Sequence, residues 1–348
     1  MNQLNRVLVT GGAGYIGSHT TLLLLQAGFD VVVLDNLCNS SAKALRRVAQ
    51  LAGRSPVFVQ GDIRDTGLLN QLLADYPVQA VFHFAGLKAV GESVAQPLDY
   101  CSNNVGGTLM LCQAMAAAGV YSLIFSSSAT VYGTPSTVPI TEEFPVGQTT
   151  NPYGRSKFIV EQMLADLVAS DSRWHIALLR YFNPVGAHES GNIGEDPLGV
   201  PYNLFPYITQ VAAGKRQELV VFGNDYPTVD DTGVRDYIHV MDLAEGHLAA
   251  LNALQNRNGI HIWNLGTGQG YSVLQIIQAI QVVSGRSVPY RIAPRRAGDI
   301  ATCYANPAKA EHDLCWIARR DLQTMIFDAW RWQMKNPDGY GSSFSGRY

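Results

Sequence analysis

The sequence predicts an α/β protein in which a doubly wound parallel sheet is followed by a smaller, mixed α/β domain. Short apolar runs alternate with helical patterns over residues 1–182. After Asn183-Pro184 the pattern changes, because Gly, Pro, Asn and Tyr become frequent and long periodic runs become rare. A chain of 348 residues also has room for about two domains.

Each predicted strand of the first part is a short apolar run between helical patterns. These strands are residues 7–9, 31–34, 57–60, 80–84, 123–126 and 176–180. The helical patterns cover residues 16–26, 68–74, 104–118 and 153–170. Alternation of this kind places helices on both faces of a parallel sheet.

The second part has fewer regular elements. Its pattern predicts a strand end and a helix over residues 237–251, a strand over 260–265, and a helix after Ser272. The segment from there to about residue 335 completes the smaller domain.

We expect the chain to cross between the two domains more than once. The first domain is expected to comprise residues 1–182 with about 236–262, and the second about 183–235 with 263–338. Residues 339–348 are rich in Gly and Ser and are expected to form a flexible tail.

The composition favours a small-molecule partner. Against 28 Asp and Glu residues stand 25 Lys and Arg residues, so the net charge is −3. Only 15% of the residues are charged, compared with about 25% in an average protein. A nearly neutral chain lacks the basic face that binds successive phosphates, so a nucleic-acid partner is not expected.

The cysteines and the apolar runs bear on location. The five cysteines are widely spaced, odd in number and without a CxxC pair; they are Cys38, Cys101, Cys112, Cys303 and Cys315. This pattern is typical of a reducing compartment. Because neither a targeting segment nor a membrane-length apolar run is recognisable, we expect a cytoplasmic protein without a membrane partner.

One metal-binding motif is incomplete. His188-Glu189 begins like the HExxH motif of zinc proteases, but position 192 is Asn, so the second histidine is missing. We therefore expect no metal.

A glycine-rich turn follows the first predicted strand and opens the first helix. The turn reads Gly11-Gly12-Ala13-Gly14-Tyr15-Ile16-Gly17 and satisfies both GxGxxG and GxxGxxG. Glycine permits a tight turn, close approach of the backbone to a pyrophosphate, and close packing of the helix on the sheet. The pyrophosphate then lies at the positive end of the helix dipole. The order strand, turn, helix predicts a dinucleotide site on a Rossmann-type sheet.

The acidic residues after the next two strands define the nucleotide. Asp35 ends the second predicted strand, 18 residues after Gly17. A carboxylate there accepts hydrogen bonds from a ribose 2′-hydroxyl and repels a 2′-phosphate, and no Arg or Lys follows before Lys43. NAD is therefore favoured over NADP. Asp62-Ile63 follows the third strand and can contact the adenine; an ordinary turn cap is the alternative for Asp62.

A Tyr–Lys pair and a serine predict the reacting centre. Tyr153 and Lys157 are four residues apart, so they share one face of a helix. A neighbouring ammonium favours the phenolate, and a tyrosine tuned in this way can exchange a proton with an alcohol or a ketone. Ser128 ends a serine triplet after a buried strand, at the sheet edge where ligands gather. A solvated Tyr–Lys pair and a serine-rich turn are the alternatives.

The glycine turn, the serine triplet and the YxxxK motif occur in an order that resembles the extended short-chain dehydrogenase/reductase family. Within that family the chain resembles the UDP-galactose 4-epimerases, from Val7 to about Pro337. The stretches that carry this resemblance are residues 81–93, 126–133, 179–187 and 233–240.

The resemblance implies reversible epimerisation of UDP-galactose and UDP-glucose at C4, by a homodimer with a tightly bound NAD that is recycled in each turnover. It implies that Tyr153 takes the proton of the sugar 4-hydroxyl while C4 gives hydride to NAD. Lys157 would lower the pKa of Tyr153 and hold the nicotinamide ribose, and Ser128 would hydrogen-bond the 4-oxygen. The 4-keto sugar would rotate and receive the hydride on its other face.

The resemblance also assigns the binding residues. Those expected at NAD are Gly11, Gly14, Tyr15, Ile16, Gly17, Asp35, Asn36, Asn39, Asp62, Ile63, Phe84, Ala85, Gly86, Lys88, Asn103, Tyr153, Lys157 and Tyr181. Those expected at the UDP-sugar are Ser128, Tyr153, Asn183, Asn203, Leu204, Phe222, Arg235, Arg296, Asp299 and Cys303.

Four of the substrate residues have particular roles, and two of these have plain alternatives. Arg235 and Arg296 match diphosphate positions, where the guanidinium fork suits phosphate oxygens. Phe222 matches the uracil pocket, and Asp299 a position at the uridine ribose. Phe222 could instead be a core residue, and Arg296 part of a solvated basic turn.

Two positions depart from the family pattern. Position 231 is Asp where the family often has Gly, and position 303 is Cys where some members carry a Tyr that narrows the sugar pocket. Because an acetamido group needs space, Cys303 predicts activity on UDP-N-acetylhexosamines as well.

Other functions remain as alternatives. Dehydratases and decarboxylases of this fold carry acidic residues directly after the active-site serine, whereas Ala129 and Thr130 follow Ser128 here. A simple reductase would release its cofactor in each cycle. A regulator that only senses NAD would not need the Tyr153 and Lys157 pair.

Overall fold

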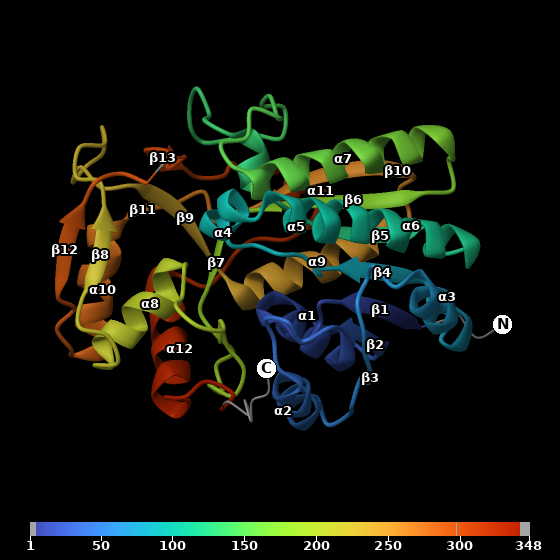
Figure 1. Ribbon diagram of the computed structural model, residues 1–348, viewed down its shortest axis with the longest axis horizontal. Helices are drawn as coiled ribbons and strands as arrows, with labels where there is room; N and C mark the ends of the chain where they lie inside the picture. The colour runs from blue at the N-terminus through green and yellow to red at the C-terminus, as the bar shows by residue number, and fades with distance from the viewer. Residues whose placement is uncertain (1–4, 297, 342–348) are drawn as a thin grey trace.

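The computed structural model describes residues 5–296 and 298–341. Figure 1 shows a large sheet with its helices on the right and a smaller part on the left. The predicted α/β class is confirmed, because the large sheet has seven strands and all of its neighbouring strands run parallel.

The large sheet has the order β10-β6-β5-β4-β1-β2-β3. The strands are β1 (Arg6–Thr10), β2 (Asp30–Asp35), β3 (Val57–Gln60), β4 (Ala80–His83), β5 (Ser122–Ser128), β6 (His175–Tyr181) and β10 (Gly259–Leu265). The chain moves outward from β1 through β2 to β3, and then continues with β4 on the other side of β1. This reversal is the topological switch point at which ligands of doubly wound sheets bind.

Helices cover both faces, as successive residues of β1 illustrate. Val7 and Val9 pack in one core and Leu8 in another, because successive side chains of a strand point to opposite faces. The first core is covered by α1 (Tyr15–Gln26), α2 (Ala42–Ala52) and α9 (Val240–Leu254). The second is covered by α3 (Thr66–Asp75), α6 (Gly107–Ala117) and α7 (Pro152–Ser170).

Four short elements connect these helices and strands. Between β4 and α6 the chain forms α4 (Val90–Ala95), α5 (Pro97–Tyr100) and the π-helix η1 (Cys101–Gly106). A 3₁₀ turn, η2 (Ala129–Tyr132), directly follows β5.

The smaller part is built on two small sheets. The first contains β7 (Asn183–Val185), β9 (Val234–His239), β11 (Gly270–Ser272) and β13 (Thr302–Cys303), all of which meet on β9. The second pairs β8 (Leu219–Phe222) with β12 (Tyr290–Ala293). Their helices are α8 (Leu204–Ala212), α10 (Val273–Ser284) and α12 (Leu322–Lys335), which pack around Phe205, Ile277 and Ile326.

Two later elements return to the large sheet. The edge strand β10 pairs with β6, and α11 (Ala308–Leu314) packs against β10 and α9. Of the expected tail, residues 342–348 lie outside the described residues. Tyr340 is buried against Trp332.

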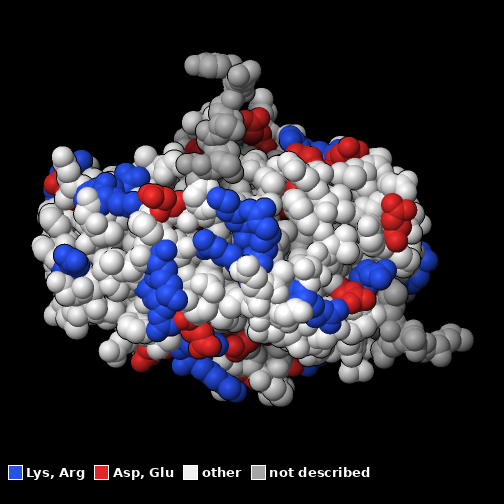
Figure 2. Space-filling model, turned by 90° about the horizontal axis from the view of Figure 1, so that it is seen from below, with Lys and Arg blue, Asp and Glu red and all other residues white. Residues whose placement is uncertain are grey.

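Charged side chains are spread in small groups. On the face seen in Figure 2, one basic group lies near the centre, and most other basic groups lie next to acidic side chains, with uncharged surface between the groups. The chain as a whole has a net charge of −3, and only 15% of its residues are charged. Within residues 5–296 and 298–341, no helix combines the length and the apolar character that crossing a membrane requires.

Candidate active site

The glycine turn lies at the switch point, between β1 and α1. Gly11 has a φ of +71°, and a Cβ there would lie 2.6 Å from the backbone nitrogen of Ala85. A Cβ on Gly17 would overlap the carbonyl oxygen of Gly11. Gly14 is the N-cap of α1, so no side chain covers the first N–H groups of the helix. The turn therefore presents bare backbone to a ligand, as the GxxGxxG pattern predicts.

Asp35 is fixed beside this turn. It is buried at the end of β2, where its Oδ2 accepts a hydrogen bond from the Ala13 backbone at 3.0 Å. Its Oδ1 accepts from the backbone of Leu37 at 2.9 Å and from the hydroxyl of Ser40 at 2.8 Å. A carboxylate oxygen can accept two hydrogen bonds, so Oδ2 can still accept from a ribose hydroxyl.

The predicted adenine residues gather at the ends of β2 and β3. Asn36 donates to the Asp62 carboxylate at 3.0 Å, and Arg64 donates to it at 2.8 and 2.9 Å. The hydrogen bonds from Arg64 hold the pKa of Asp62 well below its usual range, so this carboxylate stays ionised. The Ile63 side chain lies in the core against Gly107, which leaves only its backbone to face a ligand.

The residues after β4 form a second wall of the site. The backbone nitrogens of Phe84 and Ala85 both donate to the carbonyl of Thr10, at 2.9 and 3.1 Å, which draws this segment toward the glycine turn. A Cβ on Gly86 would lie 3.7 Å from the ammonium of Lys157. Asn103 is buried and donates to Asn104 at 3.0 Å.

Ser128, Tyr153 and Lys157 come together at the carboxyl edge of the sheet. Ser128 is the last residue of β5, and Tyr153 lies in the first turn of α7, whose N-cap Asn151 accepts from the Gly154 backbone. Lys157 is one turn further along α7 and donates to the carbonyl of Ser126 at 2.6 Å. The predicted catalytic constellation is therefore assembled within the chain itself.

The pKa values in this cluster differ from the sequence-based expectation. Burial raises the pKa of Tyr153 above its ordinary value, and the Ser128 hydroxyl opposes this rise. Burial lowers the pKa of Lys157 to about 8, although Glu161 opposes that change. The expectation that the pKa of Tyr153 is lowered is wrong for the protein alone, because burial outweighs the groups that favour the phenolate.

A buried network of hydrogen bonds and one ion pair lies next to this cluster, between α7 and the strands β5 and β6. Glu161 lies one turn after Lys157 and pairs with Arg180 of β6 at 2.6 Å, and its carboxylate accepts from Ser127 at 2.5 Å. Both charged side chains are almost fully buried, 3% exposed for Arg180 and 2% for Glu161. Tyr181, at the end of β6, hydrogen-bonds with Ser126. The network joins α7 to the two strands whose ends carry the site.

The predicted diphosphate and uridine residues lie on the two small sheets and on the segment that connects β12 to β13. Arg235 of β9 is paired in register with Cys303 of β13. Arg296 donates to the Asp299 carboxylate at 2.9 Å, and its guanidinium carbon lies 4.8 Å from the centre of the Phe222 ring. Phe222 is 37% exposed, so it is not a core residue. Phe222, Arg296 and Asp299 thus form one group, and Arg235 with Cys303 another.

The remaining predicted substrate residues lie at the starts of two elements. Asn183 is exposed at the first position of β7. Asn203 is the N-cap of α8 and Leu204 its first residue.

Asp231 has an unusual backbone conformation. Asp231 has a φ of +64°, which lies in the left-handed region that favours glycine. Its carbonyl accepts from the backbone of Tyr226 at 3.1 Å. Asp231 therefore occupies a turn position of the kind that favours glycine.

One further side chain was not predicted. Glu195 accepts hydrogen bonds from both Lys88 and Asn203, each at 2.9 Å and both on Oε1. No motif could have identified it, because its partners are 107 and 8 residues away in the sequence.

Among the described residues, no group of three or more His, Cys, Asp or Glu side chains could hold a metal ion. His188 instead hydrogen-bonds with Ser190 at 2.8 Å. This pairing gives the incomplete zinc motif a local role in its loop.

Comparison with known proteins agrees with this arrangement. The protein-family model described as "NAD dependent epimerase/dehydratase family" matches residues 7–266 of this sequence. The chain therefore belongs to this family. It is 59% identical to the UDP-glucose 4-epimerase of Bacillus subtilis (strain 168), over 97% of this chain and 99% of that protein. These matches confirm the resemblance inferred from the motifs.

Two solved structures are similar over almost their whole length. UDP-glucose 4-epimerase from Bifidobacterium longum, in complex with NAD+ and UDP, has a TM-score of 0.94 and 54% identity, over 96% of this chain and 99% of that one. The UDP-Glc/GlcNAc 4-epimerase of Campylobacter jejuni has a TM-score of 0.83 and 37% identity, over 95% and 99%.

Proposed function

We propose that this chain catalyses the reversible epimerisation of UDP-galactose and UDP-glucose at C4, with a tightly bound NAD that is recycled in each turnover. The observation that carries the proposal is the cluster of Ser128, Tyr153 and Lys157 beside a glycine turn at the switch point. The relatives from Bacillus subtilis and Bifidobacterium longum, which match over almost their full length, are UDP-glucose 4-epimerases, and this supports the same substrate class here.

The residues present fit NAD. A side chain on Gly11 or Gly17 would collide with backbone, so the turn leaves a cradle that only bare peptide can line. Asp35 is held where it can accept from the adenosine ribose, and Lys88 and Asn103 stand on the segments after β4. When bound, NAD would supply a hydride acceptor for C4 of the sugar and later return the hydride.

Tyr153 would carry the proton. In the protein alone its raised pKa keeps the phenol neutral at pH 7, whereas the base must accept the proton of the 4-hydroxyl. The Ser128 hydroxyl favours the phenolate, and the Lys157 ammonium is one helical turn away. Tyr153 would return the same proton when the ketone is reduced, so the cycle needs no external acid or base.

The small sheets would hold the nucleotide sugar. Arg235 and Arg296 offer guanidinium groups to the diphosphate, and Phe222 offers an exposed ring to the uracil. Asp299 accepts from Arg296 and would also accept from the uridine ribose. Asn183, Asn203 and Leu204 would contact the phosphates and the sugar from the starts of β7 and α8.

The direct test is sugar NMR on the purified protein with UDP-galactose and no added NAD. Conversion to UDP-glucose would support both the epimerase activity and a retained cofactor. If turnover occurs only with added NAD, the retained cofactor is wrong. If no conversion occurs even then, the proposed reaction is wrong.

We further propose that UDP-N-acetylhexosamines are substrates. Cys303 is buried in the same apolar cluster as Ala129, the residue after Ser128, and it has a much smaller side chain than Tyr. The Campylobacter relative is a UDP-Glc/GlcNAc 4-epimerase, so the family includes an enzyme with this wider range.

Cys303→Tyr tests this extension. The variant should lose conversion of UDP-N-acetylgalactosamine and keep conversion of UDP-galactose, which also reports a folded protein. Cys303→Leu, with intermediate volume, should reduce the N-acetyl activity less. Unchanged N-acetyl activity in Cys303→Tyr would contradict the pocket-size argument.

A homodimer is proposed as the assembly. Exposed apolar side chains lie on the adjacent helices α4 to α7: Val90, Val94, Leu98, Leu109 and Ile159. Leu98 is 81% exposed, which is costly for a large apolar side chain in water. Sedimentation analysis should give the mass of two chains, and Leu98→Glu should shift it toward one. A wild-type protein with the mass of one chain would contradict this assembly.

We propose a cytoplasmic location because all five cysteines are free thiols. Cys38, Cys101 and Cys315 are exposed, and exposed thiols of this kind persist in a reducing compartment. Cell fractionation tests this location directly.

A further inference from the structure

Glu195 lies between the two halves of the site. Its carboxylate accepts from Lys88, on the segment after β4, and from Asn203, the N-cap of α8. Both donors reach the same oxygen, Oε1, at 2.9 Å. The first donor is a predicted NAD residue of the large sheet, and the second is a predicted UDP-sugar residue of the smaller part.

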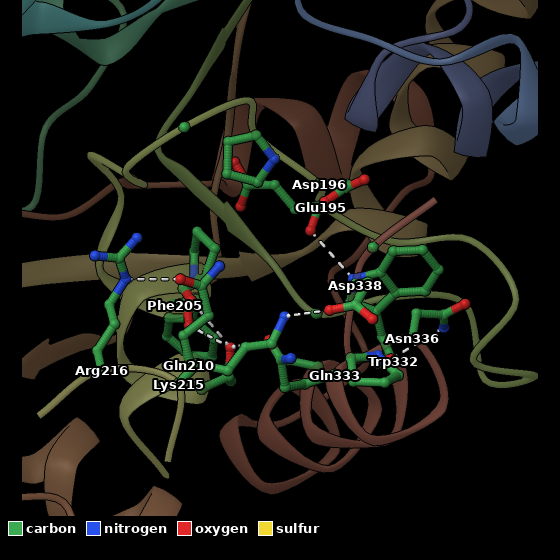
Figure 3. A pocket seen from close by; sticks show the side chains of 18 residues that line it. Glu195, Asp196, Phe205, Gln210, Lys215, Arg216, Trp332, Gln333, Asn336 and Asp338 are labelled. Atoms are coloured by element: carbon green, nitrogen blue, oxygen red, sulfur yellow. Dashed lines mark hydrogen bonds and ion pairs between the residues drawn. The ribbon is translucent and has the colours of Figure 1, made fainter. Parts of the chain in front are cut away.

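The position of Glu195 is firmly fixed. Its side chain is only 8% exposed, and its own carbonyl accepts from the Trp332 indole of α12 at 3.1 Å. Figure 3 shows this indole contact at the wall of a cavity of about 570 Å³, with Glu195 and Asp196 on the loop and Trp332 on the helix. Trp332 therefore holds the Glu195 backbone, while the Glu195 carboxylate accepts from Lys88 and Asn203.

The loop that carries Glu195 makes a second contact with the residues predicted to bind NAD. The backbone of Leu198 donates to the Asn39 side chain at 3.1 Å, and Asn39 is another predicted NAD residue. The Lys88 ammonium also lies 5.9 Å from the centre of the Tyr15 ring, next to the glycine turn. The loop of residues 195–203 therefore contacts residues predicted to bind NAD, and it also contains Asn203, which is predicted to bind the UDP-sugar.

We propose that Glu195 is a positioning residue that couples NAD binding to UDP-sugar binding. This inference rests on the function proposed above. A nearly buried carboxylate orients the Lys88 ammonium and the Asn203 amide together, so a ligand that orders one donor also orders the other. Coupling of this kind is reciprocal: UDP should strengthen the retention of NAD by the same factor by which NAD strengthens the binding of UDP.

The test compares the wild-type holoenzyme with Glu195→Gln. The amide keeps the size of the side chain and can still accept from Asn203, but it loses the charge that pairs with Lys88. The NAD retained after gel filtration is measured with and without saturating UDP, together with KM and kcat for UDP-galactose. We expect UDP to slow NAD release at least about fivefold in wild type and less than about twofold in the variant.

The kinetic expectation separates positioning from chemistry. In Glu195→Gln, KM for UDP-galactose should rise about tenfold while kcat changes less than about threefold, because the reacting groups are untouched. In a Lys88→Met background the same substitution should have less than a twofold further effect, since its partner is already absent.

Glu189→Gln is the matched control. Glu189 is exposed in the same loop, and the same chemical change there should leave both measurements at wild-type values. The proposal is overturned if UDP affects NAD release equally in wild type and Glu195→Gln, or if UDP has no effect in wild type. A lower melting temperature with unchanged coupling would also overturn it, because it would make Glu195 merely structural. Failure of the wild type to epimerise UDP-galactose would count against the proposed function, whereas NAD release tests Glu195 separately.

Discussion

The two halves of the site are built on different principles. On the large sheet, Asp35, Ser128 and Tyr181 are each the last residue of a parallel strand, so the sheet itself brings them to one edge. On the small sheets, Phe222 ends β8, whereas Arg235 is the second residue of β9. Their convergence depends on how several short elements pack.

The halves also differ in how their charges are held. The Glu161–Arg180 pair beneath the catalytic cluster is buried, whereas Arg296 and its partner Asp299 are 51% and 23% exposed. A buried pair fixes geometry and is costly to break, but an exposed pair can exchange its partner for a phosphate at little cost. The cofactor half is therefore rigid, and the nucleotide-sugar half keeps cations available.

The most damaging change should be Tyr153→Phe, which removes the proposed base without removing its ring. The rate of UDP-galactose epimerisation should fall by about 10³-fold, while NAD retention stays at the wild-type value. A kinetic assay and the absorbance of the retained cofactor measure the two effects. Tyr290→Phe, on the exposed strand β12, is the control, and full activity in Tyr153→Phe would refute the assigned base.

Glu161→Ala should destabilise the large sheet, because it removes one member of the buried Glu161–Arg180 pair. Removing one member of this buried pair leaves the Arg180 charge without its partner and should lower the free energy of unfolding by about 3–5 kcal/mol. Glu218→Ala removes the partner of Arg291 in an exposed pair between β8 and β12, and should cost less than about 1 kcal/mol. Chemical denaturation of both variants measures the contrast, which equal losses would contradict.

Lys157 should give the rigid half a distinctive pH dependence. Its pKa is about 8 in the folded chain, against an ordinary value of 10.5. Between these pH values the unfolded chain holds a proton that the folded chain has lost, so the contribution of Lys157 to the free energy of unfolding rises with pH. Below pH 8 both states are protonated, and the contribution is constant.

The measurement is the difference in unfolding free energy between wild type and Lys157→Met. This difference should change in favour of wild type by up to about 1.4 kcal/mol per pH unit between pH 8 and 10. Lys309→Met, at an exposed position, should show no such trend. A flat difference for Lys157→Met would mean that the ammonium is not affected by burial.

The smallest expected effect lies in the nucleotide-sugar half. Asp231→Gly should raise the free energy of unfolding by roughly 0.5 kcal/mol, because relief of the left-handed conformation slightly exceeds the entropy cost of glycine. Asp230→Ala should act in the opposite direction, since Asp230 accepts from Thr232 and Ser272. Thermal unfolding compares the two, and a destabilised Asp231→Gly would contradict the conformational explanation.

The buried strands of the large sheet were predicted better than the helices between them, for a physical reason. Buried parallel strands are short apolar runs, so β3 was predicted with the bounds that the structure shows. The helix α2 was not predicted, and the π-helix η1 was treated as part of an ordinary helix. A π-helix has wider hydrogen bonding than the 3.6-residue period can reveal.

Two features of the site could not be predicted from spacing. The sequence shows that Lys157 is one turn after Tyr153, but not that burial raises the pKa of the phenol. Glu195 is a single carboxylate in a loop, and only the fold brings Lys88 and Asn203 to it. Spacing identifies neighbours on one element, whereas burial and long-range contacts belong to the folded chain.

The edge strand β10 has a consequence for folding and fragmentation. In the sequence, β10 comes after much of the smaller part. In the fold, however, β10 completes the large sheet by pairing with β6. A fragment that ended at residue 182 would leave β6, with Ile176, Leu178 and Leu179, as a bare apolar edge. Such an edge pairs readily with other chains, so the fragment should aggregate, and the two parts should unfold as one cooperative unit.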